Sequence, residues 1–375
     1  MSRSPWKYFY LGILVLFSFS TFAQKTPILV ESSSYFGTPL RHSPKIVYNT
    51  DIFSWGHDLD VKWQMIGKKK WQEKHHYPRL GIQLNYLNIG QPDTLGFAIG
   101  ILPNISFALV KKERWDFRFQ FSYGMAYVNK KFDELFNPLN TAISSTINSN
   151  VIVKLENQFQ LHPRFWLKSG VNLIHLSNGT NKIPNLGVNV AAFNIGISYR
   201  PSPLADSEFI TNGIQKFHYN KWGGDLQLGL GFRERQQARG PVYPIYSTSA
   251  AIVFRPNSTN HMRVGFEYEY NRGTFVLGKE IWLFDNDDDA RAGATRLNVF
   301  YAHEFRFGPL GLYLLMGTNV SGKSVMLNSN IYNKYSVRYY LPTIGNPKTS
   351  FYGSINLKSN NTIAEYYSFS AGAIF

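Results

Sequence analysis

Hydrophobic and polar residues alternate along much of this chain with a period of two. The longest example runs from Trp115 to Tyr127, where every odd position is apolar and residues such as Asp116 and Arg118 lie between. This pattern is typical of a strand with one apolar face and differs from the 3.6-residue period of a helix. Similar runs occur at residues 80–86, 262–270, 297–301 and 310–316. The chain is therefore predicted to be all-β.

The length of the strands and their aromatic faces indicate a membrane protein. Strands of about ten residues match a tilted membrane crossing, whereas a soluble β-sandwich, which also alternates, does not need them. We count about fourteen strands after residue 80, with another candidate at 59–66, and outer-membrane barrels have even strand numbers. We therefore expect one transmembrane antiparallel up-and-down β-barrel of about 14 strands (12–16) over residues 56–375.

The N-terminus is typical of a secretory signal. Arg3 and Lys7 precede an apolar run, and Ala23 ends it with a small residue suited to cleavage. We expect residues 1–23 to be a signal peptide, with an uncleaved membrane anchor as the alternative. Residues 24–55 are less regular and are predicted to be a periplasmic lead-in to the barrel.

The predicted connections alternate in length. Long ones lie at about 128–147, 271–293 and 320–334, and short ones at about 161–163, 256–260 and 306–309, as in barrels with long external loops and short periplasmic turns. The last strand ends at Phe375, which resembles the terminal phenylalanine of outer-membrane barrels. Together these features orient the predicted barrel in a bacterial outer membrane.

Composition and charge narrow the class of protein further. Aromatic residues make up 16% of the chain and charged residues 17%, and cysteine is absent. After residue 24 no apolar run reaches 18 residues, which excludes a helical membrane protein. The net charge of +15 implies an anionic partner. For an exported chain, a phosphorylated glycolipid surface fits this charge better than nucleic acid.

One predicted hairpin, residues 164–200, interrupts its apolar face with polar residues. His175, Ser177 and Asn189 share the odd parity of Phe165 and Phe193, so they are predicted to face lipid, where polar side chains are costly and need a reason. A turn near residue 183 would place Ser177 opposite Asn189, with His175 diagonal to it.

These three residue types suit ester hydrolysis at the level of the outer leaflet. A serine hydroxyl needs an adjacent base, and His175 and Ser177 lie two positions apart on one strand. Asn189 could orient the imidazole through its side-chain carbonyl. Asn178 and Gly179 could donate hydrogen bonds to an oxyanion. The alternative is an ordinary polar margin of a barrel loop.

The run from His175 to Gly179 (HLSNG), followed by PNLGVN ending at Asn189, resembles the lipid A 3-O-deacylase family, also described as PagL-like or acyloxyacyl hydrolases. The resemblance implies an outer-membrane barrel that removes the ester-linked acyl chain at position 3 of lipid A. It also implies Ser177 as the nucleophile and His175 as the base. Some family members have glutamate where this chain has Asn189.

The asparagine is instead similar to outer-membrane phospholipase A, which needs calcium and dimerisation. The expected substrate is therefore lipid A of lipopolysaccharide, with phospholipid as the alternative, and calcium is expected only for the second. A non-enzymatic channel or transporter is the other class of function considered. The barrel assembly machinery is an expected partner, nucleic acid is not, and the sequence leaves the oligomeric state open.

An acidic cluster in a predicted outer loop is a weaker candidate site. Asp285, Asp287, Asp288 and Asp289 could bind calcium, but Ala290 stands where an EF-hand needs glycine. A solvated loop is the preferred interpretation, and no metal ligands are assigned.

Overall fold

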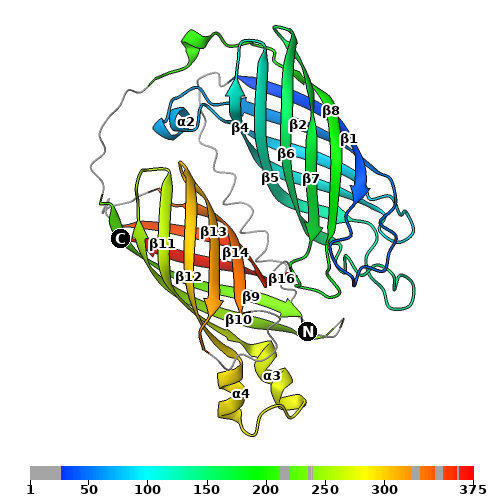
Figure 1. Ribbon diagram of the computed structural model, residues 1–375, viewed down its shortest axis with the longest axis vertical. Helices are drawn as coiled ribbons and strands as arrows, with labels where there is room; N and C mark the ends of the chain where they lie inside the picture. The colour runs from blue at the N-terminus through cyan, green and yellow to red at the C-terminus, as the bar shows by residue number, and fades with distance from the viewer. Residues whose placement is uncertain are drawn as a thin grey trace, which may run out of the picture.

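In the part of the chain that the structure describes, sixteen strands close into two separate antiparallel barrels of eight strands each (Figure 1). The computed structural model describes residues 27–211, 220–234, 238, 240–321, 330–342, 349–360 and 363–375. The predicted signal peptide, residues 1–23, lies outside the described residues. The all-β prediction is confirmed, but the prediction of a single barrel is wrong.

The first barrel contains β1 to β8. Its strands are β1 (Ile28–Pro39), β2 (Ser54–Gln64), β3 (Arg79–Asn88), β4 (Phe97–Lys111), β5 (Trp115–Val128), β6 (Ile147–His162), β7 (Phe165–Ser177) and β8 (Val188–Tyr199). A short helix, α2 (Lys70–Lys74), lies between β2 and β3, and a 3-10 turn, η2 (Asp206–Glu208), follows β8.

The second barrel contains β9 to β16. Its strands are β9 (Trp222–Glu234), β10 (Val242–Phe254), β11 (Asn260–Asn271), β12 (Thr295–Phe307), β13 (Leu310–Asn319), β14 (Ile331–Tyr340), β15 (Ser350–Asn360) and β16 (Ile363–Ile374). Two helices, α3 (Arg272–Glu280) and α4 (Asp287–Gly293), lie in the connection between β11 and β12.

The number of strands predicted from the sequence is nearly correct, but the strand pairs that close the barrels were not predicted. β3 to β16 supply the fourteen strands expected after residue 80, and β2 covers the candidate at 59–66. However, β8 pairs back with β1, and β16 pairs back with β9. Each strand alternates in the same way whichever partner closes its sheet, so the local pattern does not reveal where one barrel ends.

Part of the predicted periplasmic lead-in, residues 24–55, is a barrel strand. β1 pairs with β2 on one side and with β8 on the other, and it carries alternating inward and outward side chains. Its outward positions include Ser32 and Ser34, which interrupt the apolar alternation by which the other strands were predicted. Without β1 the first sheet could not close.

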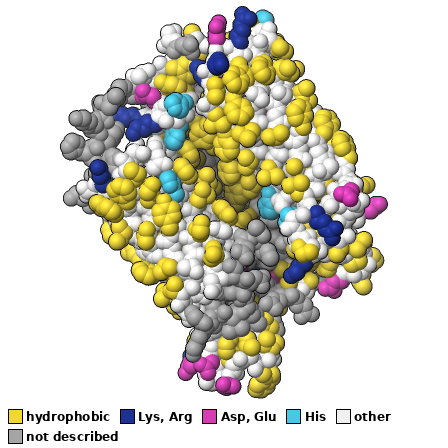
Figure 2. Space-filling view, in the orientation of Figure 1, with side chains coloured by type: hydrophobic (Ala, Val, Ile, Leu, Met, Phe, Trp, Pro, Cys, Tyr) yellow, Lys and Arg dark blue, Asp and Glu magenta, His cyan; other side chains and the backbone are white. Residues whose placement is uncertain are grey.

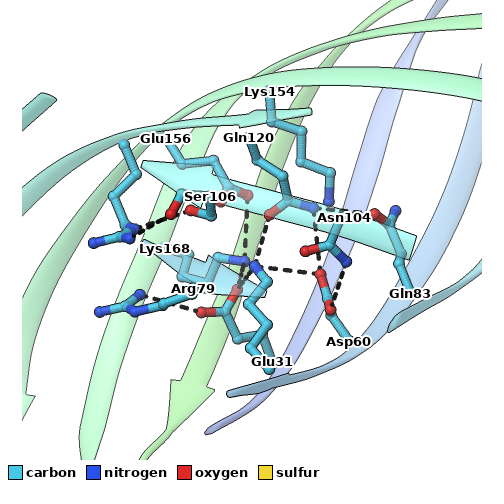
Figure 3. A network of polar contacts seen from close by, with 12 residues as sticks. Glu31, Asp60, Arg79, Gln83, Asn104, Ser106, Gln120, Lys154, Glu156 and Lys168 are labelled. Carbon is cyan, nitrogen blue, oxygen red and sulfur yellow. Dashed lines mark hydrogen bonds and ion pairs between the residues drawn. The ribbon is translucent and has the colours of Figure 1, made fainter. Parts of the chain in front are cut away.

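Charged and amide side chains fill the interior of both barrels. In the first barrel, Glu31 on β1 accepts hydrogen bonds from Lys62 and Lys168, each at 2.6 Å (Figure 3). In the second, Arg263 contacts Asp225 and Glu304, each at 2.6 Å. Eight strands leave an interior just wide enough for side chains, so these networks act as a polar core.

The outer faces carry the apolar alternation that the sequence predicted. Outward residues such as Val171, Phe193 and Ile195 are about half exposed, and hydrophobic side chains cover much of the barrel walls (Figure 2). No helix in the described part of the chain has the length and hydropathy needed to cross a membrane.

The barrels lie beside each other and touch at both ends. At one end, called here the turn end, the 65–78 connection meets the short turns at 255–259 and 308–309. There Lys74 Nζ contacts Ser258 Oγ at 2.6 Å, and His75 Nε2 donates to the Arg306 carbonyl at 2.9 Å. Burial lowers the pKa of His75, which favours the neutral ring.

The opposite end, the loop end, contains the long connections 129–146, 178–187 and 272–294. There Ile183 N donates to Glu234 Oε2 at 2.7 Å, and Thr180 Oγ1 donates to the Ala364 carbonyl at 2.5 Å. Like ends of the two barrels therefore meet, as two barrels that cross the same membrane would require.

Candidate functional site

The predicted hairpin is formed by β7 and β8, and its parity is as predicted. Apolar odd residues such as Leu173 and Phe193 are about half exposed on the outside of the barrel. Even residues such as Lys168 and Asn194 are buried in the interior. His175, Ser177 and Asn189 share the outward parity, and they lie near the loop end of the first barrel.

The register of the hairpin differs from the prediction by two residues. His175, rather than Ser177, is the direct cross-strand partner of Asn189. The observed pairing centres the connection between β7 and β8 on residue 182, one position before the predicted centre. In the observed register the imidazole of His175 and the amide of Asn189 lie directly opposite each other on the two strands.

The three side chains form one hydrogen-bonded chain. His175 Nδ1 lies 2.5 Å from Asn189 Oδ1, and His175 Nε2 lies 3.1 Å from Ser177 Oγ. An amide oxygen can only accept, so this contact places the ring hydrogen on Nδ1. Nε2 is then unprotonated and can accept the serine hydrogen.

The two residues assigned to the oxyanion differ in their availability. The backbone N–H of Asn178 donates to Asn185 Oδ1 at 2.9 Å, and its side-chain Nδ2 donates to Ser144 Oγ at 3.1 Å. The backbone N–H and one hydrogen of the side-chain amide of Asn178 are therefore engaged, which leaves one amide hydrogen for its predicted role. Gly179 adopts a left-handed conformation with φ of 61°, and among the described residues its N–H has no hydrogen-bond acceptor.

Asn185 and Gly187, both within the PNLGVN run, also lie close to these side chains. Asn185 holds Asn178 with its oxygen, while its Nδ2 is buried and has no partner among the described residues. Gly187 has φ of 77°, and a Cβ there would lie 3.0 Å from His175 Cε1. Among the described residues Asn185 Nδ2 is thus an unpaired donor near the end of β7, and Gly187 allows the chain to pass close to the imidazole.

No pattern in the sequence indicated that the second barrel contacts this site. Tyr367, on the outer face of β16, hydrogen-bonds to Ser149, which is the cross-strand neighbour of Ser177. Its ring also packs on Gly179, where an added Cβ would lie 2.1 Å from a ring carbon. Ser177 is only 1% exposed as a result of this packing and of its own loop.

The acidic cluster lies at the loop end of the second barrel, far along the chain from the hairpin. Asn286 caps α4, Lys279 hydrogen-bonds to Asp287 and lowers the pKa of that carboxyl group, and Arg291 pairs with Asp288. Among the residues that the structure describes, no three histidine, aspartate or glutamate side chains are grouped as a metal site would require.

Comparisons with known structures return other outer-membrane proteins. Neisserial surface protein A is 7% identical, with 46% of this chain and 96% of that chain covered and a TM-score of 0.33. An outer membrane channel from Pseudomonas putida F1 is 8% identical, with 94% and 96% covered and a TM-score of 0.18. No curated protein matches the chain in sequence.

Two family models match the chain, one on each barrel. The model described as lipid A 3-O-deacylase (PagL) matches residues 56–198. The model described as acyloxyacyl hydrolase, C-terminal domain, matches residues 222–375. Together they account for most of the chain, which therefore belongs to the PagL-like family of lipid A 3-O-deacylases, integral proteins of the bacterial outer membrane.

Proposed function

We propose that this protein hydrolyses the ester that links an acyl chain to position 3 of lipid A, with Ser177, His175 and Asn189 as its catalytic triad. The observation that carries the proposal is the continuous hydrogen-bond chain from Asn189 through His175 to Ser177. Neither contact joins residues of the barrel interior, where most other polar side chains of these strands lie.

The proposed reaction has two halves. His175 Nε2 takes the hydrogen of Ser177 as Oγ attacks the ester carbonyl carbon, and Asn189 steadies the resulting imidazolium through Nδ1–H. The tetrahedral intermediate collapses when Nε2 returns the proton to the departing sugar oxygen, which leaves an acyl-serine. Water then attacks the acyl-serine, with His175 again as base, and the fatty acid leaves.

The surroundings of the triad favour a membrane-embedded substrate. Ser177 has the outward parity of the apolar wall of the first barrel, where Tyr367 and its own loop cover it, and it does not face the polar interior. It is at the loop end, which the orientation from loop lengths places at the outer leaflet. The net charge of +15 suits a substrate that carries phosphates.

The test uses the purified full-length protein and lipid A that carries a 3-O-linked acyl chain, with the products followed by mass spectrometry. The wild type is expected to release that chain, and Ser177→Ala is expected to lose at least about a thousandfold in rate. Ser169→Ala is the matched control, because Ser169 also faces outward on β7 but lies away from His175. It should retain wild-type activity.

Equal deacylation by Ser177→Ala would exclude this serine as the nucleophile. Calcium-dependent release of fatty acid from phosphatidylethanolamine vesicles, without action on lipid A, would instead identify the phospholipase alternative. The measurement is therefore repeated with phospholipid, with and without a chelator.

A further inference from the structure

The second barrel reaches the nucleophile of the first through one hydroxyl group. Tyr367 projects outward from β16, hydrogen-bonds to the Ser149 hydroxyl and interacts with the hydroxyls of Ser177 and Tyr123. Ser149 and Ser177 are cross-strand partners on β6 and β7. The tyrosine hydroxyl is thus bonded to the direct cross-strand neighbour of Ser177.

The hydrogen-bond directions around Ser149 identify the donor. A serine hydroxyl has one hydrogen, and that of Ser149 donates to the Ser177 carbonyl oxygen at 2.9 Å. In its contact with Tyr367, Ser149 must therefore accept, and Tyr367 must donate. The hydroxyl hydrogen of Tyr367 is therefore bonded to Ser149, next to Ser177. Rotation of the tyrosine C–O bond would direct this hydrogen elsewhere.

Ester hydrolysis at Ser177 needs such a donor. Negative charge develops on the carbonyl oxygen in the transition state, and fixed donors there usually provide the largest single contribution to the rate. Asn178 already donates its N–H to Asn185 and one amide hydrogen to Ser144, which leaves it one hydrogen. Gly179 N–H and Asn185 Nδ2 are further possible donors on the first barrel. On the second barrel, the possible donor is the hydroxyl of Tyr367.

The interface between the barrels is shaped to hold this tyrosine in place. A Cβ at Gly179 would lie 2.1 Å from the Tyr367 ring, so only glycine allows the approach. Thr180 and Ile183, in the same connection, hydrogen-bond to Ala364 on β16 and to Glu234 on β9. The loop that follows the nucleophile is therefore fastened to the strands that carry and flank Tyr367.

We infer that Tyr367 is an oxyanion donor, so that the active site is assembled from both barrels; this inference rests on the proposed function. As Ser177 Oγ bonds to the ester carbon, the carbonyl oxygen gains the electron pair of the C=O bond. The Tyr367 hydroxyl then turns its hydrogen bond from Ser149 to this oxygen. The hydrogen bond returns to Ser149 when the intermediate collapses. The tyrosine keeps its proton throughout.

The decisive variant is Tyr367→Phe in the full-length protein, assayed on the same lipid A. Loss of one oxyanion donor costs about 100- to 1000-fold in kcat, so we expect a fall of about tenfold or more in kcat with KM changed less than twofold, because other donors remain. Tyr335→Phe is the matched control: Tyr335 is an exposed outward tyrosine of β14, and its removal should leave both constants unchanged.

The outcomes separate this inference from the proposed function. An active wild type, an inactive Ser177→Ala and a fully active Tyr367→Phe would overturn the role of Tyr367 alone. A faster Tyr367→Phe would show that the tyrosine obstructs the serine, and a change in KM alone would show substrate binding; either result overturns the inference. An inactive wild type would instead remove the proposed function.

A second measurement applies if Tyr367→Phe fails to assemble. Replacing Tyr367 with 3-fluorotyrosine keeps the ring and the hydroxyl but makes the hydroxyl a stronger donor. We expect kcat to change by severalfold at constant KM, and an unchanged kcat in the correctly folded protein would contradict an oxyanion contact.

Discussion

At the scale of single residues, Asn189 decides which nitrogen of His175 can act as a base. Its carbonyl lies 2.5 Å from Nδ1 and leaves Nε2 directed at Ser177. An amide can fix the tautomer of the ring but brings no charge to balance an imidazolium. In the proposed mechanism Asn189 is therefore a positioning residue, and its contribution is separable from that of Ser177.

Substitution of Asn189 tests this separation. Asn189→Leu is expected to lower kcat by about a hundredfold or more, because the wrong tautomer of a triad histidine is costly. Asn189→Asp keeps an oxygen acceptor and should retain activity within about tenfold of the wild type. Steady-state kinetics on lipid A compare the two, and equal losses in both would show that the acceptor oxygen does not matter.

At the scale of strands, the same alternation serves two environments. Each strand directs apolar side chains outward and polar side chains into a narrow interior, where they must find partners because an unpaired buried charge is costly. Glu31 shows the consequence: it is 1% exposed and lies between Lys62 and Lys168. β1 therefore contributes a charge that the other strands of its barrel need.

Neutralising Glu31 should destabilise the first barrel. In Glu31→Gln, the buried ammonium groups of Lys62 and Lys168 lose their shared carboxylate, and breaking a buried pair costs about 3–5 kcal/mol. Glu113→Gln makes the same change in the exposed turn between β4 and β5 and should cost close to nothing. Urea unfolding in detergent, followed by circular dichroism, compares the two variants, and equal midpoints would contradict the role of the network.

At the scale of the whole molecule, two small barrels replace the one large barrel expected. A barrel of about fourteen strands could enclose a polar channel, whereas eight strands enclose little more than their own side chains. Both interiors here contain buried ion pairs, such as Arg263 with Glu304 and Lys154 with Asp58. The architecture thus favours the outer surface and the junction between the barrels, rather than a lumen, as the working parts.

A conductance measurement tests this conclusion. The purified wild type, inserted into a planar lipid bilayer, is expected to produce no stable ion-conducting steps, because the interior of an eight-stranded barrel is about filled by its own side chains. A large porin inserted under the same conditions provides the positive control. Reproducible steps that depend on the amount of protein would restore the channel as an additional function.

The sequence by itself determined the all-β class, nearly every strand, the outward parity of the hairpin and the identity of His175, Ser177 and Asn189 as a group. These properties are local, because residues two apart on one strand share a face and a short connection brings neighbouring strands together. Only the tertiary structure decided where each sheet closes, how β1 joins the first barrel and which interior charges pair. It also decided that Tyr367, 218 residues from Ser149 along the chain, bonds to that serine beside Ser177. Such contacts depend on the packing of one closed barrel against another, and no period or spacing along the chain records that packing.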